Sequence, residues 1–107
     1  MAVSDADIAF VRDLFSELGG ITTRKMFGGL GIYSEGTIFA IKMSDGTLRL
    51  KGAGAMVETF ATEGWEPWTY TRKDGAASSM PYWTMPEALL DDPQAACEWA
   101  RRALSHL

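Results

Sequence analysis

Apolar residues recur along this chain at two different spacings, and the change of spacing separates helices from strands. From Ser4 to Leu18 they recur three to four residues apart, which predicts a helix. Ser4 and Asp7 have the spacing of a capping box at its start. Gly19 and Gly20 are expected to end this helix, because glycine readily adopts the backbone conformations that follow a helix.

Shorter β-type segments follow, separated by turn residues. We predict four strands, at residues 21–27, 30–34, 37–43 and 47–51. Glu35-Gly36 and Ser44-Asp45-Gly46 read as turns, the second with an Asp-Gly hairpin signal. Strands so close together in sequence usually pair as an antiparallel meander.

A run of glycines joins the first two of these strands. Gly28, Gly29 and Gly31 lie between Arg24-Lys25 and the apolar residues that follow. Glycine within a strand-like segment marks a bend, a bulge or a close approach of two backbones. We therefore assign these three residues a structural role. The run lacks the lysine and the following helix of a phosphate-binding loop.

The second half of the chain adds helices and two more strands. We predict a helix at residues 52–63 with Met56, Val57 and Phe60 inward, and strands at 65–72 and 79–84. Pro67 and Pro81 should make these strands edge-like or irregular. A helical turn through Leu90, with Thr84 and Glu87 at capping-box spacing, precedes a last helix with an apolar stripe that ends at Leu107. The expected fold is α+β: one antiparallel or mixed sheet of about six strands, covered by the N- and C-terminal helices, in the order helix, four strands, helix, two strands, helix.

Apolar and polar residues alternate along the third and fourth predicted strands, which predicts a sheet with one face exposed to solvent, here called the wet face. Phe39, Ile41 and Met43 would be buried together with Leu48 and Leu50. The opposite face would then gather basic side chains, if the register allows, from Arg24, Lys25, Lys42, Arg49 and Lys51. This face is either a charged surface that keeps the protein in solution or a binding surface for anionic and acidic partners.

Composition limits the possible functions. The 107 residues fit a single domain, 1–107, with 47% hydrophobic residues and a net charge of −4. Residues 19–57 carry a net charge of +3, whereas domains that grip phosphates are usually basic overall. No apolar run is long enough to span a membrane, and residues 1–5 do not resemble a secretory signal. A cytoplasmic protein with no membrane association is expected.

The residue types that carry catalysis are sparse. Cys97 and His106 are the only cysteine and histidine, they lie far from an ordinary zinc-site pattern, and Cys97 reads as a packing residue. The pair Asp91-Asp92 precedes Pro93, where a helix cap explains it. We expect no catalytic residues, no metal and no cofactor.

Aromatic residues are dense in the last strand pair: Trp65, Trp68, Tyr70, Tyr82 and Trp83. Core and edge packing is one use for them, and a contact surface for a protein partner or a second copy in a homodimer is another. A stacking platform for single-stranded nucleic acid would need more interleaved basic residues.

Several segments resemble one known family. Residues 24–33, Arg-Lys-Met-Phe-Gly-Gly-Leu-Gly-Ile-Tyr, and the later Pro81-Tyr82-Trp83 with Pro86-Glu87 are similar to the TfoX/Sxy N-terminal domain. The resemblance covers nearly the whole chain. It implies a non-enzymatic bacterial α+β domain related to regulators of natural competence, which act with a cyclic-AMP-responsive activator at certain promoters. Full-length regulators continue into a second, helical domain, so this chain is expected to be a stand-alone member or a piece of a longer protein.

Three functions follow as hypotheses. The first is a binding module that contacts another protein, such as a component of the transcription machinery, through the wet face or the aromatic edge. The second is direct nucleic-acid binding through the five basic residues, which should weaken steeply with salt. The third is an enzyme of an unfamiliar kind, which would need a pocket that holds titratable groups with shifted pKa values.

Overall fold

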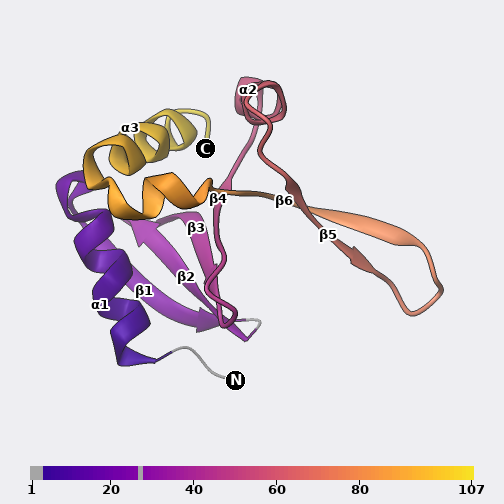
Figure 1. Cartoon of the computed structure of the whole chain (residues 1–107), viewed down its shortest axis with the longest axis horizontal. Coiled ribbons are helices and arrows are strands. Elements are labelled where there is room, and N and C mark those ends of the chain that lie inside the picture. Colours follow the sequence, from indigo (N-terminus) through magenta and orange to yellow (C-terminus); the bar gives the residue numbers. More distant parts are fainter. Residues whose placement is uncertain (1–3, 27) are drawn as a thin grey trace.

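The chain folds around one six-stranded antiparallel sheet, as the computed structural model shows for residues 4–26 and 28–107 (Figure 1). The strand order is β1-β2-β3-β4-β6-β5, so β5 and β1 form the two edges. The strands are β1 (Ile21–Met26), β2 (Gly29–Ser34), β3 (Thr37–Met43), β4 (Leu48–Lys51), β5 (Pro67–Thr71) and β6 (Ala77–Thr84).

The helices lie on one side of this sheet or at its end (Figure 1). They are α1 (Asp5–Leu14), the 3₁₀ turn η1 (Ser16–Leu18), α2 (Ala55–Thr62), the 3₁₀ turn η2 (Glu87–Asp91) and α3 (Pro93–Leu104). The predicted α+β fold, its element order and the covering by the first and last helices are confirmed. The end of the first predicted strand, at residue 27, lies outside the described residues.

Capping residues explain where two of the helices begin. The hydroxyl of Ser4 accepts a hydrogen bond from the backbone N–H of Asp7 at 3.3 Å, and the carboxylate of Asp7 accepts one from the N–H of Ser4 at 2.8 Å. Asp92 caps α3 by accepting from the N–H of Ala95 at 3.2 Å. The predicted box of Thr84 with Glu87 is wrong, because Thr84 belongs to β6 and η2 begins after Pro86 without a side-chain cap.

The core fills the space between the sheet and the helices. Phe60 stacks on Trp65 in this core, with ring centroids 4.6 Å apart. The ring centroids of Trp65 and Trp99 are 4.8 Å apart. Two residues that we predicted to face inward do not: Val57 is 41% exposed and Leu107 is 40% exposed. Val57 sits on the outer side of a two-turn helix, and Leu107 lies beyond the last turn of α3.

A β-bulge in β3 overturns the predicted alternation. Ile32 pairs with Ala40 and Tyr33 pairs with Ile38, so Phe39 has no partner on β2. Phe39 turns toward the helices, where its ring meets that of Phe15 edge to face at 5.1 Å. From Ala40 onward each side chain of β3 therefore points to the face opposite the predicted one, because cross-strand partners point to the same face.

As a result Lys42 shares the helix-covered face with Leu48, and Ile41 shares the opposite face with Arg49. The expectation that Ile41 and Met43 are buried with Phe39, and that Lys42 lies on the wet face, is therefore wrong.

Close contacts explain two glycines, one in the sheet and one just after it. A Cβ at Gly29 would lie 2.8 Å from the carbonyl oxygen of Lys42. A Cβ at Gly52, just after β4, would lie 2.8 Å from the Trp83 ring and 2.9 Å from the Phe60 ring. Gly28 has a φ of +73°, which suits the turn between β1 and β2.

We expect Gly52→Ala to destabilise the fold by about 1–3 kcal/mol, because both neighbouring rings are part of the packed core. Urea unfolding followed by tryptophan fluorescence measures this cost. Phe60→Leu removes one of the two obstructing rings, so the double variant should cost less than the sum of the single variants. A Gly52→Ala protein as stable as the parent would contradict the packing described here.

Candidate functional site: the helix-free face of the sheet

The face of the sheet opposite the helices is the candidate site. Alternation and strand pairing place on it side chains from all six strands and from the two residues that flank β5: Thr22, Arg24, Met26, Tyr33, Ile38, Ile41, Met43, Arg49, Lys51, Glu66, Trp68, Tyr70, Arg72, Ser78, Met80, Tyr82 and Thr84. We call this set the helix-free face. No helix in the described part of the chain packs on it.

Apolar side chains cover the middle of this face. Ile41 and Tyr82 are buried, yet neither belongs to the core cluster beneath the helices. Gly31 lies next to Ile41 in the sheet, and a Cβ there would be 3.1 Å from the Met26 sulfur and 3.3 Å from the Ile38 methyl carbon. The missing side chain of Gly31 thus lets Met26 and Ile38 lie flat against the sheet. No residue pattern predicts this layer, since the bulge that creates it has no glycine or proline to mark it.

Three of the five predicted basic residues share this face. Arg24 is exposed on the edge strand β1, and Arg49 and Lys51 are half-buried on β4. The guanidinium carbon of Arg49 lies 5.1 Å from the centre of the Trp68 ring. Among the described residues the Nε of Arg49 is buried without a hydrogen-bond partner. Burial lowers the pKa of Arg49, and the charge of Asp45 opposes that shift.

The other two basic residues face the helix side. Lys25 is exposed there, at the edge of the sheet. Lys42 is buried to 7% exposure, with its ammonium 4.9 Å from the centre of the Phe10 ring and 4.0 Å from Asp7. It also donates a hydrogen bond to the carbonyl of Gly46 at 3.3 Å. Lys42 therefore serves the contact between α1 and β3 and does not join a basic surface.

The residues that we predicted to be structural lie where the chain is tightly packed or irregular. Gly28, Gly29 and Gly31 shape the β1–β2 hairpin as described above. Trp83 is buried in the core, with its ring centre 5.6 Å from that of Phe60. Pro81 lies where the register between β5 and β6 shifts, and its carbonyl accepts a hydrogen bond from Gly52 at 3.0 Å.

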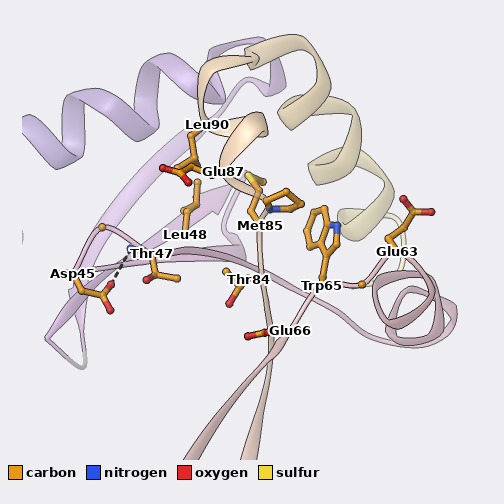
Figure 2. Close-up of a pocket in the computed structure, with 13 residues that line it drawn as sticks. Asp45, Thr47, Leu48, Glu63, Trp65, Glu66, Thr84, Met85, Glu87 and Leu90 are labelled. Carbon is orange, nitrogen blue, oxygen red and sulfur yellow. Dashed lines mark hydrogen bonds between the residues drawn. The ribbon is translucent and has the colours of Figure 1, made fainter.

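A cleft that holds carboxylates adjoins this face at Glu66 and Thr84. It is open, has a volume of about 630 Å³, and is lined by Asp45, Glu63, Glu66 and Glu87 around Trp65 and Met85. Figure 2 shows Asp45 and Glu63 at opposite ends of it. Hydrogen bonds from Thr47 hold the pKa of Asp45 below its usual value. Within residues 4–26 and 28–107, no three acidic, histidine or cysteine side chains converge as metal ligands would.

The cysteine and the histidine are far from catalytic geometry. Cys97 is 1% exposed, and its thiol donates a hydrogen bond to the carbonyl of Leu14 at 3.3 Å. Burial is the main cause that raises the pKa of Cys97. His106 is exposed near the end of the chain, where its ring nitrogen lies near Gly54.

The fold and this face together define an α+β domain in which helices cover one face of the sheet and leave the other face uncovered. A family model described as the TfoX N-terminal domain matches residues 13–107. The chain therefore belongs to the TfoX N-terminal domain family. A search of curated proteins found no match. In the described part of the chain no helix has the length and apolar character to cross a membrane.

We expect Cys97 to react with a thiol reagent only when the protein unfolds. A buried thiol with a raised pKa forms little thiolate, which is the reactive species. Labelling with a chromogenic disulfide reagent at neutral pH, with and without denaturant, measures the difference. Rapid labelling of the folded protein would show that α3 does not shield the sulfur as described.

Proposed function

We propose that this chain is a non-enzymatic regulatory domain that binds a protein partner, a component of the transcription machinery, through the helix-free face. The observation that carries the proposal is a sheet face with no helix on it, on which cationic groups of β1 and β4 lie among apolar side chains. Membership of the TfoX N-terminal domain family supports a role related to the regulation of competence.

The chemistry of the face favours a partner that offers both apolar and acidic side chains. Met26, Met43 and Met80 provide an adaptable apolar surface, because methionine side chains are flexible and polarisable. Arg49, stacked on Trp68, has the composition of an interface anchor, since arginine and tryptophan dominate binding energies at protein interfaces. A carboxylate of the partner would pair with the half-buried guanidinium of Arg49.

Direct nucleic-acid binding is the second candidate. The stacking of Trp68 with Arg49, and the nearby Tyr82 ring at 6.3 Å from Trp68, favour it, because aromatic and cationic groups together bind single strands. Two facts weigh against it. Of the five basic residues predicted for the site, only Arg24, Arg49 and Lys51 share one face, and the net charge of the chain is −4.

Arg49→Met should reduce capture of the partner from a native lysate by at least about tenfold, because it removes the cationic anchor and keeps an apolar side chain. The matched control is Lys42→Met, which removes an equal charge from the opposite face and should leave capture unchanged. Equal losses for both variants, or none for either, would contradict the proposed face. Circular dichroism of both variants confirms that each is folded.

A gel-shift titration with single-stranded and duplex DNA at low and high salt separates the two candidates. We expect no shift for the parent protein at low salt. A shift that weakens steeply with added salt and is lost in Arg49→Met would favour nucleic acid in place of the protein partner.

A further inference from the structure

The ribbon formed by β5 and β6 projects from the body of the molecule (Figure 1). Strand β4 pairs only with residues 82–84 of β6, so residues 77–80 of β6 and 68–71 of β5 pair only with each other. Nearly all side chains from 69 to 77 are exposed, Tyr70 to 44%. Two-stranded ribbons are marginally stable in water without a third strand or a covering layer.

The outer edge of this ribbon is β5, and beyond Pro67 and the register shift at Pro67/Trp68 its sequence does not protect it. Edge strands are usually blunted by charged residues within the strand. The other edge strand, β1, carries Arg24 and Lys25, whereas β5 is Pro-Trp-Thr-Tyr-Thr with no charge. Charges stand only at its two flanks, where Glu66 precedes it and Arg72 follows it. We propose that β5 is a homodimerisation edge that pairs antiparallel with β5 of a second copy of this chain, around a two-fold axis at Thr69.

The backbone of β5 fits this pairing. The N–H of Arg72 donates to the carbonyl of Ala76 at 2.8 Å, so Arg72 faces β6. Because bonding directions alternate along an antiparallel strand, Tyr70 and Trp68 also face β6, and the backbone groups of Thr69 and Thr71 point to the free edge. Pro67, the other outward residue, has no N–H to leave unpaired. Pairing at Thr69 would give four hydrogen bonds: two between the Thr69 residues, and one from each Thr71 N–H to the carbonyl of Pro67 of the other copy.

The flanking charges select this register. With Thr69 opposite its own copy, Trp68 lies opposite Tyr70 and Glu66 lies opposite Arg72, and each pair occurs twice. All four residues lie on the helix-free face, because their positions differ by two. A register shifted by two, with Thr69 opposite Thr71, would instead place Glu66 opposite Asp74, a like-charge pair. Arg72 now lies 3.6 Å from Asp74, but both side chains are more than half exposed, so this contact is weak.

The dimer would have one continuous sheet. A two-fold axis at Thr69 runs perpendicular to the plane of the sheet and keeps both helix layers on one side. The helix-free faces of the two copies would then join into one surface. The proposed dimer forms along the edge of β5, whereas the proposed partner binds on the helix-free face. A monomeric protein would therefore still leave that face to be tested by the Arg49→Met comparison.

Charge exchange at the two flanks tests the pairing in solution. Glu66→Arg and Arg72→Glu each place like charges across the interface twice, so each variant alone should dimerise at least about tenfold more weakly than the parent. Mixing the two single variants restores opposite charges at both pairs and should give a heterodimer. The double variant should also recover the homodimer. Sedimentation velocity over a concentration series measures all four samples.

Thr69→Pro provides a backbone test. It removes the central outward N–H without removing a bond to β6, so it should abolish the dimer while the near-UV circular dichroism spectrum stays that of a folded chain. Thr69→Val keeps the N–H and is the matched control, which should dimerise like the parent. A parent chain that is monomeric at every concentration would overturn the proposal. So would a dimer that is unaffected by Thr69→Pro, or single charge variants that fail to associate with each other.

Discussion

The contact between Phe15 and Phe39 sets the arrangement of the sheet. Phe39 reaches the ring of Phe15 only because β3 carries one residue more than β2 at that point. This bulge exchanges the two faces of β3 from Ala40 onward. A bulge costs one cross-strand pairing, but here it places a large aromatic residue in the core, where a ring pair contributes about 0.5–1.5 kcal/mol beyond its buried area.

The exchange of faces determines which charged side chains lie on the helix-free face. It turns Lys42 under α1, where the buried stem packs by Phe10 and the ammonium is near Asp7. It also turns Ile41 and Met43 to the side without helices, next to Arg49. The helix-free face is therefore more apolar and less basic than simple alternation implies. Gly31 contributes to the same result, since the absence of its side chain lets two long apolar residues lie across the strand.

The sequence was sufficient for the element order and for the starts of α1 and α3. Capping residues such as Ser4 and Asp92 and the glycine-marked turns are local signals, and local signals can be read without knowing which strands pair. The bulge at Phe39 is not a local signal, because β3 contains no glycine or proline there and only the partner strand reveals the extra residue.

The errors at Lys42, Ile41 and Met43 have this one origin. By contrast Leu48 and Leu50 lie on the regular strand β4, and alternation placed them correctly in the core. The site was accordingly predicted in part. The face exists and holds Arg24, Arg49 and Lys51, but its apolar centre was assigned to the core.

The projecting ribbon is held at its root by the aromatic part of the core. Trp83 lies near the inner end of β6, and Trp65 lies two residues before β5. Both rings contact that of Phe60, and Trp65 also contacts Trp99 of α3. Gly52 lets these rings approach the backbone after β4. A rigid root fixes the direction of the ribbon, although its outer residues bury little surface of their own. An exposed strand held in a fixed direction loses less conformational freedom on pairing than a flexible one, so the packing around Phe60 would favour the proposed association at β5.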